Sequence, residues 1–270
     1  MATVLEILRA TPRTNCGECG YPACMAFAVA CATGAAPLSL CPYIRAEGLD
    51  TRCAQGEDER EYAKAGASIA ETALLKDLRE KIRHVDLQAR AVWIGAEAVQ
   101  EGGETALVLP YLGRFIKISA GAMEDPQKGE PDPRDQILLY NYIFFGGKGG
   151  LSGEWVGLES FPNSISKVVT LRKYTEDKLA TAFTGKVSAL GEAGRRLGGR
   201  PVEPCHADLC MVIPVLPMVP VQILFWDADE EDGFPARAKV LFDSRALSFL
   251  DIESLIFATE RMAETIIGSL

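Results

Sequence analysis

Four cysteines near the start of the chain have the spacing of metal ligands. Cys16, Cys19 and Cys24 follow one another closely, and Cys41 completes the pattern C-x2-C-x4-C-x16-C. Thiolates on short loops can face one point, and a fourth thiolate that arrives from beyond a helix can close the site. The pattern is therefore typical of a [4Fe–4S] cluster, in which each cysteine binds one iron.

Glycines surround these cysteines. Gly17 and Gly20 suit a loop around a cluster, because backbone without a Cβ can approach it and direct N–H groups at its sulfur. A zinc site more often has two C-x2-C pairs, and only one is present here. Unliganded thiols would leave four cysteines among glycines unexplained, so a cluster is the favoured interpretation. Cys31 lies seven residues after Cys24 and is interpreted as a small apolar filler.

A second group of candidate ligands lies far along the chain. Cys205, His206 and Cys210 could hold a metal or supply an axial ligand to a bound cofactor. Cys210 leads into an apolar run, so a buried structural role is favoured over ligation. The start of the chain does not resemble a secretory signal, and disulfide bonds are therefore not expected among the eight cysteines.

Two further segments carry weaker signals. Residues 227–232 fit a calcium-binding loop at three positions, but Asp232 stands where the loop needs glycine and Ala238 where it needs glutamate. A solvated turn is favoured there, with metal binding and partner recognition as alternatives. Residues 146–150 resemble a phosphate-binding loop, yet Gly149 replaces the Ser or Thr that such a loop needs.

Composition limits the class of protein. The 270 residues are 48% hydrophobic and 24% charged, as in a globular protein, and the net charge of −9 disfavours binding to nucleic acid. The apolar stretch 25–40 is too short to span a membrane. The stretch 209–226 contains three prolines, which favour buried strands over a membrane helix. We therefore expect a cytoplasmic protein without a membrane span.

Periodicity predicts an α+β fold, with a small cluster-binding domain at 1–45 and a larger α+β domain at 46–270. The larger domain is expected to be helical over 59–99 and mixed over 103–270. Asp135 is expected to cap a helix. The predicted helices are 22–33, 59–85, 87–99, 135–145, 177–197 and 251–267, and the predicted strands are 105–109, 115–118, 154–158, 209–213, 219–226 and 238–242.

The cysteine motif resembles a known module. NCGECGYPACMAFA and the later LCP are similar to the four-cysteine iron–sulfur domain of the corrinoid iron–sulfur protein large subunit and of the Rnf complex B subunit. This resemblance covers about the first 45 residues and implies one [4Fe–4S] cluster on Cys16, Cys19, Cys24 and Cys41. From about residue 60 onward the chain resembles the domain of unknown function 3786, which implies an anaerobic setting. YLGRFIKIS, LSGEWVGLESFP and VPVQILFWDADEEDGFPARAKVLFDS carry that resemblance.

These residues support one main hypothesis and two alternatives. The first is an iron–sulfur protein that passes single electrons to or from a partner protein. The second is a redox enzyme or carrier whose larger domain binds another cofactor, such as a corrinoid, which the cluster reduces. The third is an interaction protein with a structural cluster. The spacing reveals no catalytic triad or carboxylate pair, so whether the protein is an enzyme stays open.

Overall fold

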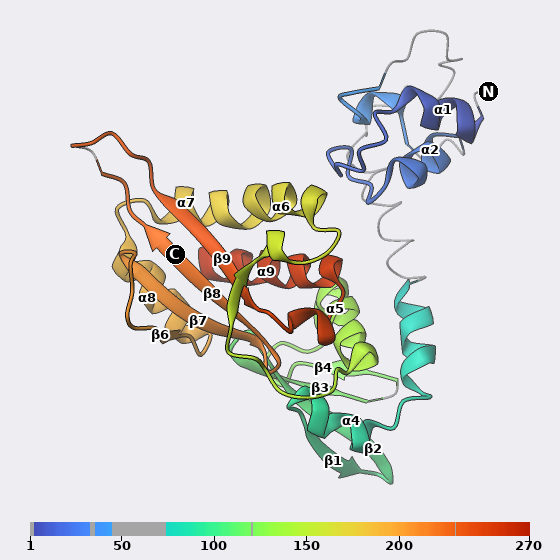
Figure 1. Cartoon of the computed structure of the whole chain (residues 1–270). Helices are drawn as coiled ribbons and strands as arrows, with labels where there is room; N and C mark the ends of the chain where they lie inside the picture. The colour runs from blue at the N-terminus through green and yellow to red at the C-terminus, as the bar shows by residue number, and fades with distance from the viewer. Residues whose placement is uncertain (1–2, 33–35, 45–73, 120, 230) are drawn as a thin grey trace. The chain divides into compact units, whose positions relative to one another are not determined.

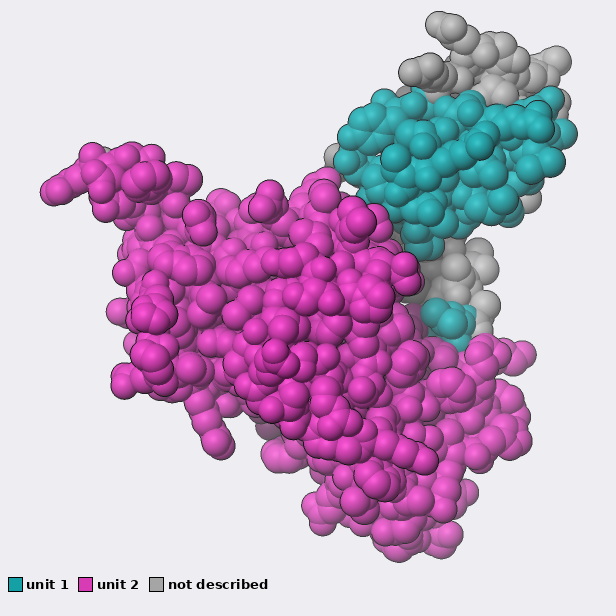
Figure 2. All heavy atoms as spheres, viewed as in Figure 1, with its two compact units in different colours: residues 1–75 teal, residues 76–270 magenta. Residues whose placement is uncertain are grey.

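The chain divides into two compact units, residues 1–75 and 76–270 (Figure 2). The computed structural model describes residues 3–32, 36–44, 74–119, 121–229 and 231–270. The expected domain boundary at residue 45 and Cys53 both lie outside the described residues.

The first unit contains two short helices and one 3-10 turn. Helix α1 (Val4–Ala10) begins with a capping box, in which Thr3 accepts from the Glu6 amide and Glu6 accepts from the Thr3 amide. Helix α2 (Cys24–Ala32) lies within the predicted range 22–33, and η1 (Leu38–Leu40) follows it. The unit has a small apolar core, formed by Ile7, Cys19, Phe27, Ala28, Cys31, Ala36, Leu38 and Cys41.

The second unit contains two antiparallel sheets (Figure 1). The four-stranded sheet has the order β1-β2-β3-β4, and the five-stranded sheet has the order β5-β9-β8-β7-β6. The strands are β1 (Glu97–Glu101), β2 (Glu104–Tyr111), β3 (Arg114–Ile118), β4 (Met123–Glu124), β5 (Trp155–Gly157), β6 (Arg200–Pro201), β7 (Leu209–Leu216), β8 (Val219–Trp226) and β9 (Arg237–Asp243).

Helices cover the five-stranded sheet, and the helices at Asp177–Phe183, Val187–Arg196 and Ile252–Ile267 pack against its strands (Figure 1). Residues 74–82 are also helical. The remaining helical elements are α4 (Leu87–Ile94), α5 (Pro133–Phe145), η2 (Leu158–Ser160), α6 (Ile165–Leu171), the π-helical η3 (Arg172–Glu176), α7 (Asp177–Phe183), α8 (Val187–Arg196), η4 (Ala246–Ser248) and α9 (Ile252–Ile267). The predicted α+β class is confirmed.

Two predicted helices differ from the observed ones. The helix expected over 87–99 ends at Ile94, because Gly95 adopts a left-handed conformation and the next residues pair with β2 as strand β1. The helix expected over 177–197 is two helices, since the chain turns at Gly185, where φ is +71°. Of the helix expected over 59–85, only the part from residue 74 lies within the described residues.

The prolines at 214, 217 and 220 belong to a strand pair, as predicted. Pro214 faces Pro220 across β7 and β8, and Pro217 lies in the turn between the strands. Strand β8 is the central strand of its sheet and is buried along most of its length. Among the described residues, no helix is long and apolar enough to cross a membrane.

Asp135 does not cap helix α5, contrary to the sequence-based expectation. Asp132 accepts from the Arg134 amide at the N-cap, because Pro133 begins the helix two residues earlier than predicted. Asp135 instead lies inside the second unit with 1% of its surface exposed. There its carboxylate accepts hydrogen bonds from Tyr111, Arg114 and Arg261, so it joins β2, β3, α5 and α9.

Candidate metal centre

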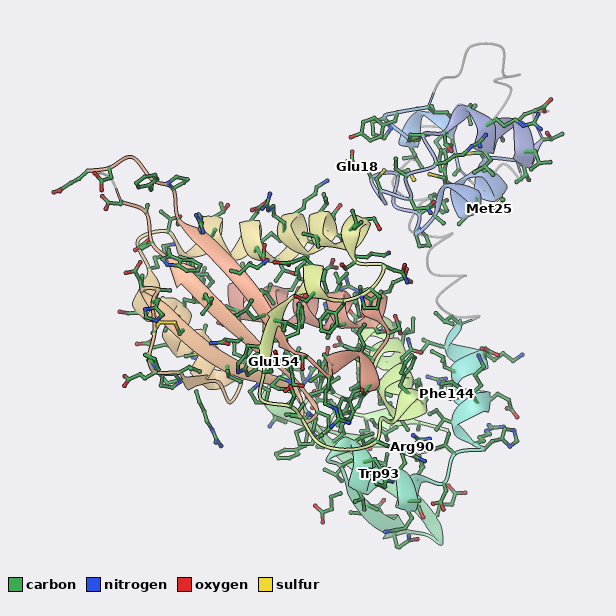
Figure 3. All side chains as sticks on the ribbon, viewed as in Figure 1. Glu18, Met25, Arg90, Trp93, Phe144 and Glu154 are labelled. Atoms are coloured by element: carbon green, nitrogen blue, oxygen red, sulfur yellow. A yellow bond between two sulfur atoms is a disulfide. The ribbon has the colours of Figure 1, made fainter. Side chains whose placement is uncertain are left out.

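The four predicted ligands lie on three adjoining parts of the first unit. Cys16 and Cys19 belong to the loop between α1 and α2, Cys24 is the first residue of α2, and Cys41 directly follows η1. Cys19, Cys24 and Cys41 are buried and Cys16 is half-buried, while none of the four is in a disulfide. Figure 3 shows sulfur atoms beside the loop that carries Glu18.

The loop between the helices depends on its two glycines. Gly17 has φ +74° and Gly20 has φ +83°, a region that residues with a Cβ seldom adopt. The Gly20 amide donates to the Gly17 carbonyl at 2.9 Å, which closes a tight turn around Cys19. No atom lies within 4 Å of a Cβ built on Gly20, so the conformation alone requires glycine there.

A polar contact joins the two ends of the site. The Tyr43 hydroxyl donates to the Glu18 carboxylate at 3.0 Å. Glu18 precedes Cys19 in sequence and Tyr43 follows Cys41 by two residues. The contact therefore brings Cys41 to the loop of Cys19, as a shared site requires.

Asn15 connects Cys24 to the same loop. Its side-chain oxygen accepts from the Cys24 amide at 2.9 Å, which satisfies a backbone donor at the start of α2. Asn15 has φ +50°, and asparagine tolerates that conformation better than most residues. Its role was not predicted from sequence, because the two residues are nine positions apart and match no local capping pattern.

Replacing Asn15 by alanine is expected to loosen the start of α2. Loss of such a cap typically costs about 1 kcal/mol, or roughly a fivefold change in a local opening equilibrium. Hydrogen exchange in peptides that cover the first turn of α2 should therefore accelerate about fivefold. Asn15→Asp retains the oxygen acceptor and serves as the control. Equal exchange in wild type, Asn15→Ala and Asn15→Asp would show that the contact has no such role.

The surroundings of Cys19 reveal how the thiols interact. Burial raises the pKa of the Cys19 thiol above its ordinary value, and the nearby thiols of Cys41 and Cys16 raise it further. Metal binding therefore has to displace a proton from the Cys19 thiol. The buried Tyr21 hydroxyl has no hydrogen-bond partner among the described residues. It lies near Cys19 and Cys31, where sulfur can accept a hydrogen bond.

The donor set fits an iron–sulfur cluster. Four sulfur ligands of one zinc ion would lie about 3.8 Å apart, given a Zn–S bond of about 2.3 Å and tetrahedral geometry. The described residues contain no group of three or more His, Cys, Asp or Glu side chains gathered around a point for one ion. A [4Fe–4S] cluster does not need such a group, because each cysteine binds a different iron.

Cys31 lies on α2 with its side chain fully buried. Its neighbours in the apolar core include Ile7 and Phe27. This is the position expected for an apolar filler.

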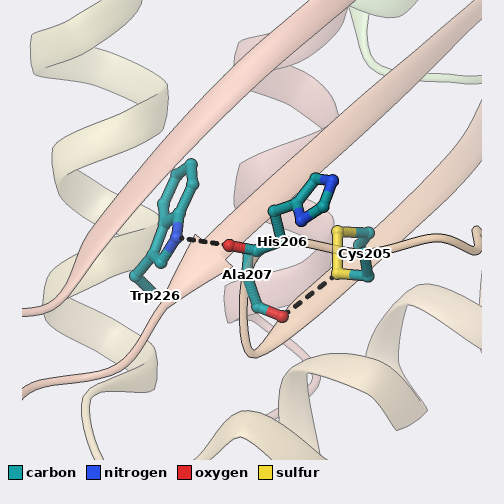
Figure 4. The surroundings of a disulfide bond; sticks show 5 residues. Cys205, His206, Ala207 and Trp226 are labelled. Carbon is teal, nitrogen blue, oxygen red and sulfur yellow. Dashed lines mark hydrogen bonds between the residues drawn. A yellow bond between two sulfur atoms is a disulfide. The ribbon is translucent and has the colours of Figure 1, made fainter.

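Cys205 and Cys210 form a disulfide, contrary to the expectation that disulfides would be absent (Figure 4). That expectation rested on the lack of a signal sequence, which carries no information about which cysteines meet in space. While this bond is present, neither sulfur is available to a metal or cofactor, so ligation by Cys205, His206 and Cys210 stays a prediction for the reduced protein. His206 is exposed, and its carbonyl accepts from Trp226 Nε1 at 3.1 Å.

Residues 227–229 and 231–232 of the acidic segment lie in the connection between β8 and β9. Asp227 and Asp229 both use a carboxylate oxygen to accept backbone amides, which is the behaviour of turn residues. A pocket of about 870 Å³ lies beside this turn. Its lining includes Asp208, Trp226, Asp227, Asp229, Glu231, Phe234 and Arg237.

The glycine-rich segment 146–150 is a structural loop. A Cβ on Gly146 would lie 1.6 Å from the Arg90 guanidinium, and one on Gly149 would lie 2.6 Å from that of Arg245. Arg90 and Arg245 donate to the Phe145 and Lys148 carbonyls, so the loop backbone is fixed by two arginines (Figure 3 labels Arg90). The glycines therefore permit close packing, and a loop is confirmed.

Comparison with known protein families covers both units. A family model described as "Domain of unknown function (DUF3786)" matches residues 86–265, and the chain belongs to this family. A second model, described as "Putative Fe-S cluster", matches residues 12–43, which include all four predicted ligands. The chain thus carries a match to a putative Fe–S cluster domain at residues 12–43 and a DUF3786 domain at residues 86–265.

Several relatives share shorter stretches. The corrinoid/iron-sulfur protein large subunit of Moorella thermoacetica is 49% identical over 55 residues, which is 19% of this chain and 12% of the relative. The acetyl-CoA decarbonylase/synthase complex subunit gamma 1 of Methanosarcina thermophila is 34% identical over 113 residues, which is 42% of this chain and 19% of the relative. The chain thus matches less than a fifth of either relative's length. No solved structure shows a significant match.

Proposed function

We propose that this chain binds one [4Fe–4S] cluster through Cys16, Cys19, Cys24 and Cys41 and exchanges single electrons with a partner protein. The spacing of the four cysteines carries this proposal, and the Glu18–Tyr43 contact, which joins the segment after Cys41 to the loop of Cys19, supports it. The cluster, when bound, supplies a reversible one-electron step. We further propose that residues 1–45 form its domain and that the protein works in an anaerobic cytoplasm.

The chain's own residues prepare the site for electron transfer. Burial of Cys19, Cys24 and Cys41 excludes water from most of the sulfur ligands, which helps to retain the cluster. Cys16 is only half-buried, so one corner of the cluster would lie near the surface and within reach of a partner. The names of two relatives describe a subunit of a complex or of a larger protein, which agrees with a protein partner.

The proposal is tested by a redox titration of anaerobically purified protein, followed by absorbance and electron paramagnetic resonance. We expect about four irons per chain, a broad visible absorption and a reversible signal that accounts for about one electron. A cluster that neither accepts nor donates an electron across the accessible range of potentials would contradict electron transfer. It would support the interaction protein with a structural cluster.

A second proposal concerns the larger unit, which would bind another cofactor such as a corrinoid. It is favoured only by the name of one relative, whose similarity extends over 55 residues. The same purified sample tests it, because a corrin has its own visible absorption and can be extracted and weighed by mass spectrometry. A corrin in stoichiometric amount would establish a redox enzyme or carrier, and iron as the sole chromophore would reject it.

A further inference from the structure

A feature of the second unit indicates a separate redox function. The Cys205–Cys210 disulfide lies in the β6–β7 connection and at the start of β7. The five described cysteines of the first unit are free thiols. In a reducing compartment, where such thiols persist, a disulfide is more often transient and functional than structural. This disulfide also closes only a short loop, and short loops give the smallest gain in stability. A structural role therefore explains it poorly.

The two sulfurs differ in accessibility. Cys205 is half-buried in a loop beside the exposed His206, whereas Cys210 is 5% exposed. Cys210 is also fixed in strand β7, where it pairs with Leu224 of β8. An incoming thiolate would thus reach Cys205 first, and Cys210 would act as the resolving partner.

The loop is held in place independently of the disulfide. Trp226 Nε1 donates to the His206 carbonyl at 3.1 Å, and the Asp227 amide donates to the Asp208 carboxylate at 2.7 Å (Figure 4 shows the first contact). These contacts keep Cys205 beside Cys210 after the bond is broken. Closure of the pair is then intramolecular and fast compared with capture by a second molecule.

The reduced state also has a prepared acceptor. The Cys205 sulfur lies 3.1 Å from the Ala207 carbonyl oxygen (Figure 4). In the disulfide that sulfur carries no hydrogen, so the contact cannot be a hydrogen bond. After reduction the Cys205 thiol can donate to the same oxygen without any movement of the loop.

We propose that Cys205 and Cys210 are a reversible two-electron dithiol/disulfide centre that exchanges with a dithiol. A thiolate of that dithiol attacks the Cys205 sulfur, the Cys205–Cys210 bond breaks, and Cys210 leaves as a thiolate that takes up a proton. The second thiol of the dithiol then attacks the mixed disulfide and releases Cys205, which is also protonated. The pair gains two electrons and two protons, and the dithiol becomes a disulfide.

Peptide mass spectrometry of the full chain tests the pair without interference from the first unit. Trypsin should release both cysteines in one peptide, residues 197–237, which contains no other cysteine. After treatment of native protein with dithiothreitol, we expect alkylation of both sulfurs, and after reoxidation with glutathione disulfide we expect neither. A bond that resists dithiothreitol until the protein is denatured would overturn the proposal, as would thiols that do not pair again.

Two matched variants test the assigned roles. Cys210→Ser should form a mixed disulfide with glutathione at Cys205 about tenfold faster than Cys205→Ser forms one at Cys210, because access differs. Equal rates in the two folded variants would contradict the asymmetric exchange. Iron content and paramagnetic resonance are read separately, so loss of the cluster and failure of this pair give different results.

Discussion

Replacing Cys41 by alanine is expected to abolish the cluster. The iron content should fall from about four per chain to near zero, and the broad visible absorption should disappear, because one iron loses its only protein ligand. Cys41 is suited to this test, since it lies beyond α2 and is the proposed fourth ligand, separated in sequence from Cys16 and Cys19. Iron analysis and absorbance of anaerobically reconstituted protein provide the measurement.

Cys31→Ala is the matched control. Cys31 is fully buried in the same apolar core as Cys19 and Cys41 and is likewise not in a disulfide, but it lies outside the ligand spacing. The control should retain iron and colour, with a small loss of stability from the missing sulfur atom. Full iron content in Cys41→Ala, or loss of iron in Cys31→Ala alone, would contradict the assigned ligand set.

The Cys41→Ala variant also tests whether the two units fold independently. The first unit has a small core, so metal ligation should supply much of its folding free energy. Loss of the cluster should therefore unfold the first unit while the second keeps its thermal transition. Circular dichroism would reveal a single collapse of both units if they were energetically inseparable.

Replacing Asp135 by alanine is expected to destabilise the second unit by about 3–5 kcal/mol, because it removes the buried carboxylate that Arg114 and Arg261 share. Arg114 then retains only Asp125, and Arg261 retains Glu264 and Asp132. Asp135 accepts from Arg114 at 2.9 Å and from Arg261 at 2.7 and 3.1 Å. It also accepts from Tyr111, whose pKa is raised well above its ordinary value by burial and by Asp135. The phenol therefore stays protonated and donates. Urea denaturation of the full chain, followed through the larger unit, measures the loss.

Glu159→Gln is the control for this experiment. Glu159 pairs with Lys239 at 3.3 Å, but its side chain is 57% exposed, and such surface pairs contribute about 0–1 kcal/mol. A loss of similar size in both variants would indicate that the Asp135 network is no more important than a surface pair.

Much of the fold follows from local patterns. The strands at β2, β3, β8 and β9 were predicted within a few residues, because alternating or continuous apolar runs bounded by turn residues are local signals. Helix α9 was predicted from its amphipathic period. Strand β1 was missed, since residues 97–99 continue an apparent helical pattern and become a strand only by pairing with β2.

Some residues of the candidate site were also proposed from sequence, and others were found only in the structure. The four cysteines were proposed as ligands from sequence because their spacing is typical of a ligand loop, and Gly17 and Gly20 because a backbone without a Cβ can approach a cluster closely. The positive φ of both glycines was found only in the structure. Asn15 and Tyr21 were not identified, since their contacts depend on how the loop folds over α2.

The sequence alone thus determined the four-cysteine motif, the α+β class and the presence of two family resemblances in one chain. Only the tertiary structure decided that Cys205 bonds to Cys210 and that Asp135 meets Arg261, 126 residues further along. The physical reason is the range of the interactions. Ligand spacing, caps and periodicity act over a few residues, whereas a buried ion pair or a disulfide depends on where distant segments meet. Those meetings are set by the packing of the whole core.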